Sequence, residues 1–183
     1  ILETDPIFDG LIKDVIPMSP SAPNFGSTST VGDIFQGSDK LRDGYGLKGE
    51  GVKIGVISDS YAKRPISLGG TTAQQDIDRE DLPGKSTNPE NTKPVEVVKD
   101  FPAAATDEGR AMLQIVHDIA PKATLLFRTG SISANDMALG IQELADKGCN
   151  IIVDDLTFFR EPFFRDGIVT KAIDNVKVAG VSY

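Results

Sequence analysis

The stretch Gly51-Val52-Lys53-Ile54-Gly55-Val56-Ile57-Ser58 decides the fold class of this chain. It is short, apolar and rich in β-branched residues, with a glycine before it and a serine after it. A continuous apolar run of this length is typical of a strand that is buried on both faces. A second run of the same kind, at residues 95–98, predicts another strand.

Downstream of these strands, segments of helical and of strand character alternate. The pattern predicts helices at residues 107–119, 134–147 and 162–178, and strands at 124–128, 150–154 and from 180 onward. Strands that recur at this spacing with helices between them form right-handed crossover units, and these units build parallel sheets. We therefore expect an α/β fold of three layers, with a mostly parallel sheet and helices on both faces.

The chain divides into two regions of different composition. Residues 1–48 are rich in Pro, Ser, Gly and Asp and predict an extended arm that wraps onto a domain, with one helix at 33–41. Residues 49–183 form the α/β domain, and because a strand has only just begun at the last residue, we expect this domain to be truncated. Within it, the polar segment 62–94 is expected to be a surface excursion that is either functional or mobile.

Charge and hydropathy argue against two classes of partner. The 183 residues carry 19 basic and 27 acidic side chains, and the net charge of −8 repels phosphate backbones and anionic lipids. Every apolar run falls far short of the roughly 20 residues that a membrane span needs. The single cysteine, Cys149, excludes an internal disulfide and a cysteine-based zinc cage. We expect neither a nucleic-acid partner nor a membrane span.

Acidic residues stand where the predicted strands end. Asp59 follows the first strand, Asp107 and Glu108 begin the helix after the second, and Asp154 and Asp155 end a later one. The active crevice of an open parallel sheet lies outside these carboxyl ends. Each acid alone is also what a helix N-terminus or a loop commonly contains. Three such positions on one edge of the sheet nevertheless predict a functional site.

Metal binding is a weaker alternative for these acids. Asp59, Glu108 and Asp154 or Asp155 would supply the oxygen ligands that magnesium and calcium prefer. The 62–94 segment offers a second acidic set, Asp76, Asp78, Glu80 and Asp81, that could hold calcium. A solvated acidic loop is the favoured interpretation of that set, and we expect the protein to need no cofactor.

Histidine catalysis is not expected at this edge. His117 is the only histidine, and it lies nine residues after Glu108 on the same predicted helix, about 13 Å along its axis. We interpret His117 as a helix-end or core residue. Gly109, directly after Glu108, indicates either close approach of a substrate or neighbouring strand, or fraying of the first helical turn.

The order of these motifs resembles that of the subtilisin-like serine peptidases. Residues 51–60 resemble the family's first core strand and its aspartate, and Glu108-Gly109-Arg110-Ala111 stands where the family has His-Gly-Thr. Ile119-Ala120-Pro121 resembles a Val-Ala-Pro segment, Ile151-Ile152-Val153 the strand that leads to the substrate-binding strand, and Ala179-Gly180-Val181 the strand that ends at the oxyanion asparagine. The resemblance covers residues 49–183.

The resemblance implies the N-terminal part of a serine endopeptidase in which Glu108 replaces the catalytic histidine. A glutamate in this role is similar to the sedolisin branch, where it activates the serine. Sedolisins have an aspartate four residues later, where this chain has Met112, so Asp59 is expected to orient Glu108 through a hydrogen bond. The nucleophile would lie beyond Tyr183, because Gly26-Ser27-Thr28-Ser29 belongs to the arm; the chain alone is expected to be inactive.

The same resemblance implies how substrate binds. The implied substrate-binding residues are Arg128, Thr129, Gly130 and Asp155, with an extended peptide added as a strand beside residues 128–133. The implied partners are a peptide or protein substrate and the C-terminal remainder of the protein, and the implied location is secreted, cell-surface or periplasmic. A degenerate domain that only binds peptide, or that serves as a structural module of a larger surface protein, is the alternative.

Overall fold

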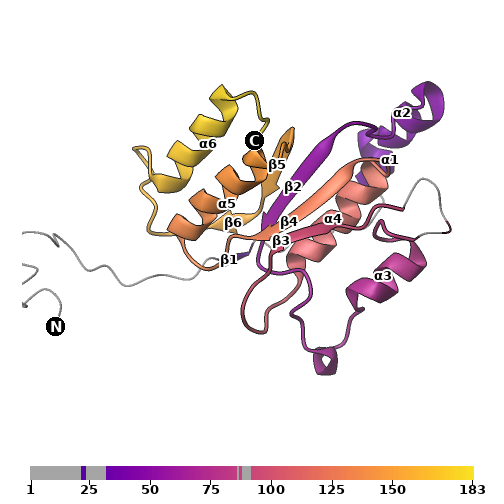
Figure 1. The fold of residues 1–183 in the computed structure, drawn as a ribbon, viewed down its shortest axis with the longest axis horizontal. Coiled ribbons are helices and arrows are strands. Elements are labelled where there is room, and N and C mark those ends of the chain that lie inside the picture. Colours follow the sequence, from indigo (N-terminus) through magenta and orange to yellow (C-terminus); the bar gives the residue numbers. More distant parts are fainter. Residues whose placement is uncertain (1–21, 24–31, 86, 88–91) are drawn as a thin grey trace, which may run out of the picture.

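The computed structural model describes residues 22–23, 32–85, 87 and 92–183, and its architecture is the predicted α/β class. A four-stranded, all-parallel sheet has the order β3-β4-β2-β5 (Figure 1). These strands are β2 (Lys53–Ser58), β3 (Glu96–Lys99), β4 (Thr124–Thr129) and β5 (Ile151–Asp154). The apolar run at residues 52–57 therefore supplies a central strand, β2, which is buried along nearly its whole length.

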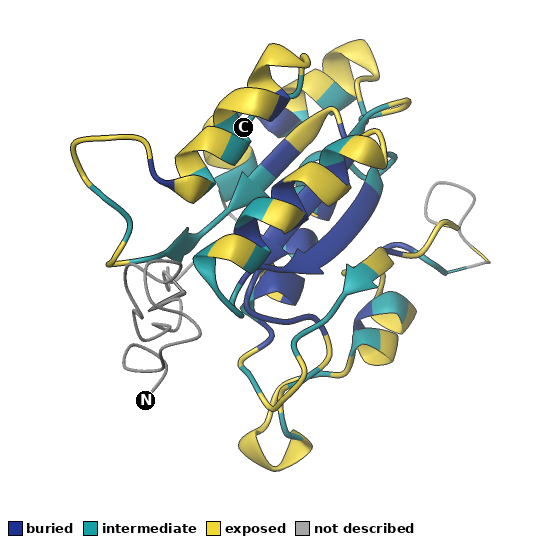
Figure 2. Ribbon diagram, turned by 60° about the vertical axis from the view of Figure 1, so that its left-hand side comes forward, coloured by how far each residue is buried: buried dark blue, intermediate teal, exposed yellow. Residues whose placement is uncertain are grey.

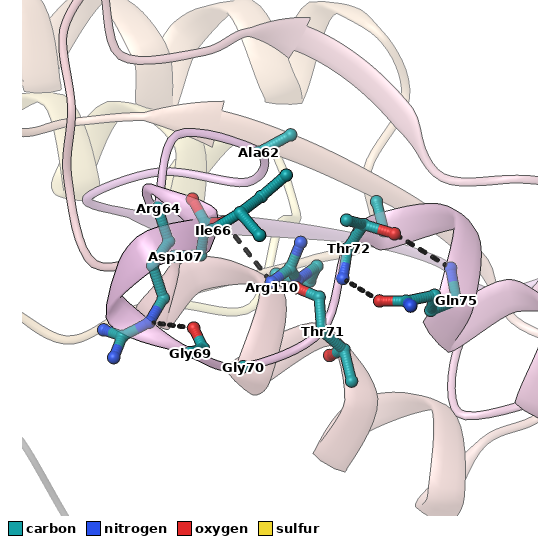
Figure 3. Close-up of a pocket in the computed structure, with 11 residues that line it drawn as sticks. Ala62, Arg64, Ile66, Gly69, Gly70, Thr71, Thr72, Gln75, Asp107 and Arg110 are labelled. Carbon is teal, nitrogen blue, oxygen red and sulfur yellow. Dashed lines mark hydrogen bonds and ion pairs between the residues drawn. The ribbon is translucent and has the colours of Figure 1, made fainter.

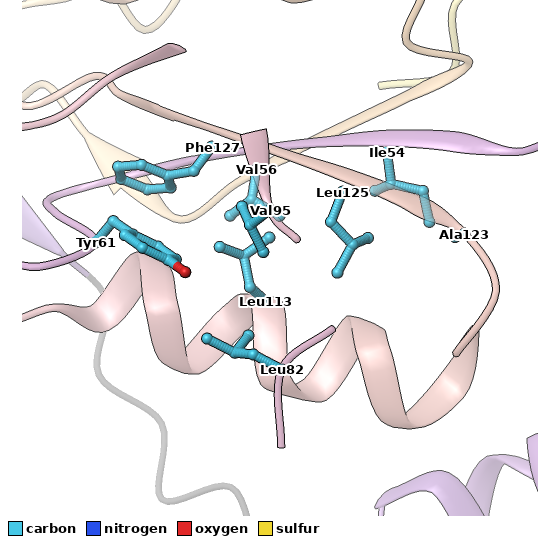
Figure 4. Close-up of a cluster of buried hydrophobic side chains, with 9 residues drawn as sticks. All are labelled: Ile54, Val56, Tyr61, Leu82, Val95, Leu113, Ala123, Leu125 and Phe127. Carbon is cyan, nitrogen blue, oxygen red and sulfur yellow. The ribbon is translucent and has the colours of Figure 1, made fainter. Parts of the chain in front are cut away.

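Helices cover both faces of the sheet, so the predicted three-layer arrangement is confirmed. On one face lies α4 (Glu108–Ile119), and its Leu113 packs with Val56, Leu125 and Phe127 (Figure 4). On the other face lie α5 (Ala134–Asp146) and α6 (Ile168–Val178). Figure 2 shows the buried strands in dark blue between helices whose outer faces are exposed. Each face of the sheet carries its own cluster of buried residues. Successive side chains of a strand enter the two clusters in turn, because they point to opposite faces of the sheet.

Three predicted boundaries differ from the structure. The helix expected at 33–41 is two helices, α1 (Gly32–Gln36) and α2 (Ser38–Tyr45), because Gly37 between them is left-handed at φ 76°. The helix expected from residue 162 begins at Ile168, where the carboxylate of Glu161 accepts the N–H of Val169 at 3.2 Å. The strand expected from residue 180 is reduced to a single parallel bridge between Ser182 and Ile151.

Most described residues of the segment at 62–94 are exposed, as expected of a surface excursion, but the segment is also anchored to the domain. It contains the short turn η2 (Ile66–Leu68) and the helix α3 (Ala73–Arg79), whose first turn is closed by a capping box between Thr72 and Gln75. Leu82 is completely buried in the core cluster beneath α4 (Figure 4). The sequence did not indicate that Leu82 is buried, because a single apolar residue in a polar segment gives no helical or strand periodicity.

A second, two-stranded sheet joins the arm to the domain. Here β1 (Ala22–Pro23) pairs antiparallel with β6 (Leu156–Thr157), with Ala22 opposite Thr157. The described part of the arm therefore does lie on the domain, while the serine-containing stretch 26–29 falls outside the described residues. Among the helices that the structure describes, none is both long and apolar enough to cross a membrane.

Leu82→Ala tests the anchoring of the 62–94 segment. Removing a fully buried side chain leaves a cavity and should lower the free energy of unfolding by about 2–5 kcal/mol. The matched control is Leu68→Ala in the same segment, where the side chain is 63% exposed and the change should be within about 0.5 kcal/mol. Urea unfolding of both variants measures this difference, and similar small losses for the two would mean that the segment is not anchored.

Candidate active site

The carboxylate of Asp59 joins the end of β2 to the start of α4. Its Oδ1 accepts the backbone N–H of Glu108 at 2.9 Å and that of Gly109 at 3.4 Å. Its Oδ2 accepts the N–H of Thr106 at 2.7 Å and also the hydroxyl of that residue. These amide donors have no partner within the helix, and the N-terminal end of the helix dipole favours a negative charge. Asp59 therefore caps the helix that carries Glu108.

Asp107 fixes the backbone immediately before Glu108. It has the left-handed conformation, with φ at 58°, which is uncommon for a residue with a side chain. Its Oδ1 accepts the Ser60 hydroxyl at 2.8 Å and the Lys63 N–H at 2.6 Å, and its Oδ2 lies 3.3 Å from Nη2 of Arg110. Such contacts offset the cost of the conformation, of order 1 kcal/mol, and hold Glu108 at the first helical position.

Close packing explains the glycine at position 109. A Cβ there would overlap the ring of Phe127 on β4 and would lie 2.9 Å from the carbonyl oxygen of Ser60. Gly109 is buried, and its N–H is one of those bound by Asp59. Approach of the neighbouring strand, and not fraying of the helix, is therefore the reason for this glycine.

The side chain of Glu108 meets a second carboxyl group, that of Asp155. The Asp155 carboxyl lies close enough to act on the charge of Glu108, and Glu108 accepts the Ser58 hydroxyl at 3.2 Å. Burial raises the pKa of Glu108 to about 8, reinforced by the hydrogen bond to and repulsion from Asp155 and by the charge of Asp59. Loss of water and a neighbouring carboxyl both disfavour the charged form, so Glu108 retains its proton well above the usual range for a carboxyl.

This pairing corrects the predicted partner of Glu108. Asp59 contacts the backbone of Glu108 but, in the described part of the chain, makes no side-chain hydrogen bond with its carboxyl. Asp155 follows β5, which lies directly beside β2 with Asp154 opposite Ile57. The sequence predicted both acids at one edge of the sheet, but the partner depends on strand order and on the helix donors that occupy Asp59.

Three of the implied substrate-binding residues lie in the interior instead. Arg128 is 1% exposed and forms ion pairs with Asp136 at 2.5 Å and with Glu143 at 2.9 Å. Thr129 is fully buried and donates its hydroxyl to the carbonyl oxygen of Asp59 at 2.6 Å. Gly130 is buried as well, where a Cβ would lie 2.8 Å from a methyl group of Leu156. These positions stabilise the domain and present no side chain to a peptide.

An extended segment does lie beside the acid pair, at a different place from the predicted one. Leu156 and Thr157 directly follow Asp155, and the backbone of Ala22 and Pro23 pairs with them. The strand edge next to Asp155 is therefore occupied by an extended segment of the chain itself, in antiparallel orientation. No signal in the sequence marked this edge, because a two-residue strand has no periodicity.

Two acids of the proposed calcium set form ion pairs, and the histidine is buried in the core. Within the described residues, no group of three or more histidine, cysteine or acidic side chains is arranged to hold a metal ion. Asp76 of the proposed calcium set is buried 3.1 Å from Nε of Arg110, and Glu80 pairs with Lys85 at 2.8 Å. His117 is 3% exposed, as expected of a core residue, and burial lowers its pKa.

A cavity of about 400 Å³ lies beside the N-terminus of α4. The loop at 62–72 forms one wall, and Asp107 and Arg110 form the other (Figure 3). Arg110 lies between Asp107 and Thr71, and donates to the carbonyl oxygen of Thr71 at 2.6 Å. Two of the lining residues, Asp107 and Arg110, flank Glu108 in the sequence, and most of the others belong to the loop that follows Asp59.

Neither the models of known protein families nor the curated proteins contain a match to this chain.

Glu108→Gln should change how stability depends on pH. Glu108 binds its proton more tightly when folded, with a pKa of about 8 against 4.5, so its contribution is complete below pH 4.5 and is lost as pH rises to about 8. Glutamine has no proton to lose, so the free energy of unfolding of the wild type should fall relative to that of the variant as pH rises from 4.5 to 8.5. Thermal unfolding across that range measures it, and a constant difference would contradict the buried pair.

Asp59→Ala should destabilise the junction between β2 and α4. Its removal leaves amide donors of Glu108 and Gly109 unpaired, and we expect a loss of about 1–3 kcal/mol in the free energy of unfolding. Asp59→Asn keeps one oxygen acceptor and should lose distinctly less. Equal losses for the two variants in urea unfolding would show that capping is not what Asp59 contributes.

Proposed function

We propose that this chain is the N-terminal part of the catalytic domain of a subtilisin-like serine endopeptidase in which the Glu108–Asp155 pair replaces histidine. The observation that carries the proposal is the position of the Glu108 and Asp155 carboxyls, close enough to interact, at the carboxyl edge of neighbouring parallel strands. Active sites of open parallel sheets lie at this edge, and strongly perturbed pKa values concentrate at such sites. The order of motifs along residues 49–183 supports the same assignment.

Glu108 acts as the general base in this proposal. In its ionised form Glu108 accepts the proton of a serine supplied by the rest of the protein. The serine oxygen attacks the peptide carbonyl carbon. The protonated Glu108 then donates its proton to the leaving amine as the carbon–nitrogen bond breaks. Asp155 is thus the orienting acid, and Asp59 holds Glu108 in place through the helix N-terminus.

The substrate is an extended peptide that takes the place of Ala22–Pro23 at the strand edge directly after Asp155. Backbone pairing in this manner gives affinity, and side-chain pockets give selectivity. The antiparallel contact of Ala22–Pro23 with Leu156–Thr157 supports this location, since it places an extended segment there. The family resemblance further favours a protein that works in a secreted, cell-surface or periplasmic setting.

A second candidate function is peptide binding without catalysis. The occupied edge at Leu156–Thr157 favours it, because the strand pairing requires no nucleophile. Under this alternative the acid pair is a remnant that contributes only to structure. Binding would persist when Glu108 is replaced, and turnover would be absent in every variant.

The test is peptide hydrolysis by the full-length protein that contains this chain. We expect turnover to rise as pH increases toward the Glu108 pKa of about 8, with Glu108→Gln and Asp155→Asn each lowering kcat by at least about 100-fold. Asp166→Asn, at an exposed carboxylate before α6, is the matched control and should retain full activity. Equal turnover in all variants would overturn the proposed base, and peptide binding without hydrolysis would establish the second candidate.

A further inference from the structure

The carboxylate of Asp154 closes the turn that presents Asp155. Asp154 is the last residue of β5, and its Oδ1 accepts the N–H of Leu156 at 3.0 Å. Its Oδ2 accepts the hydroxyl of Tyr183 at 2.6 Å. The carboxylate of the residue before Asp155 therefore binds the backbone of the residue after it. The hydroxyl of Tyr183, 29 residues further along the chain, holds that carboxylate in place.

Tyr183 is itself held against the sheet. The N–H of Ser182 donates to the carbonyl oxygen of Asn150, and the N–H of Ile152 donates to that of Ser182, each at 2.9 Å. These two bonds form the parallel bridge beside β5, near the C-terminus marked in Figure 1. The ring of Tyr183 also packs on the core cluster that includes Ile152 and Val176. The backbone beside Tyr183 is thus hydrogen-bonded to the sheet and its ring is packed, so the position of its hydroxyl is fixed.

The surroundings keep Tyr183 a hydrogen-bond donor. Burial and the neighbouring carboxylate raise the pKa of the Tyr183 phenol, and burial raises the pKa of Asp154. The groups that face Asp154 are Tyr183, the Leu156 amide and Asp155. Those that face Glu108 are Ser58, Asp59 and Asp155, and Asp154 is not among them. An effect of Tyr183 on Glu108 must therefore pass through the position of Asp155.

We propose that Tyr183, acting through Asp154, is a positioning residue that holds the Asp155 carboxyl against Glu108. The contacts of one carboxylate with Tyr183 and with Leu156 set the path of the turn, and the turn sets where the Asp155 side chain lies. The catalytic consequence rests on the proposed function, because only an active peptidase needs this pair. The geometric claim concerns the pair itself and can be measured without any turnover.

The experiment measures the apparent pKa of Glu108 by infrared titration, with Glu108→Gln identifying its carboxyl band. Tyr183→Phe and Asp154→Ala release the turn and should each lower the pKa of Glu108 by at least about one unit, a tenfold change in proton affinity. Asp154→Asn retains a side-chain oxygen for the Leu156 amide and an amide to meet the tyrosine hydroxyl. It should leave the pKa of Glu108 within a few tenths of the wild-type value.

Val176→Ala is the control for a merely structural effect. Val176 is 1% exposed in the core on which Tyr183 packs, so its truncation should lower Tm without moving the pKa of Glu108. If Tyr183→Phe and Asp154→Ala lower Tm but leave that pKa unchanged, the positioning role is overturned. If they lower the pKa and the full-length protein nevertheless hydrolyses no peptide, the positioning role stands and the proposed function fails.

Discussion

The arrangement of the site depends on one interaction, the capping of α4 by the carboxylate of Asp59. A helix begins with amide donors that its own backbone cannot satisfy, and here an acid from the end of a buried strand satisfies them. The contact therefore fixes the start of α4 relative to β2. Gly109 allows the helix to approach Phe127 closely, and the strained Asp107 sets the direction in which the chain enters. Glu108 stands at the first position of this fixed helix.

Burial then determines the chemistry of Glu108. A carboxylate that loses water is destabilised, and a second carboxyl beside it destabilises the charge further, so the pair holds a proton. The same geometry gives different roles to four acids at this edge of the sheet. Asp59 organises the backbone, Glu108 and Asp155 form the pair, and Asp154 closes the turn beside them.

Much of the fold could be predicted because its signals are local. The apolar run at 52–57 and the regular alternation after residue 107 placed the central strands and the helices within a few residues. The site was predicted only in part. Glu108 and Asp155 were both named, but Asp59 was assigned as the partner, and Arg128 was assigned to substrate although Asp136 and Glu143 neutralise it inside the domain. Charge type is visible in a sequence, whereas burial and partners are not.

The sequence by itself determined that a parallel α/β sheet forms and that acids gather at its carboxyl edge, because hydrophobic periodicity and residue type express both. Only the tertiary structure decided which acids meet. Strand order places β5 beside β2, and this brings Asp155 to Glu108 from 47 residues away along the chain. The antiparallel contact of Ala22–Pro23 and the reach of Tyr183 to Asp154 arise in the same way. Such contacts depend on the relative positions of whole elements, which no local pattern of residues records.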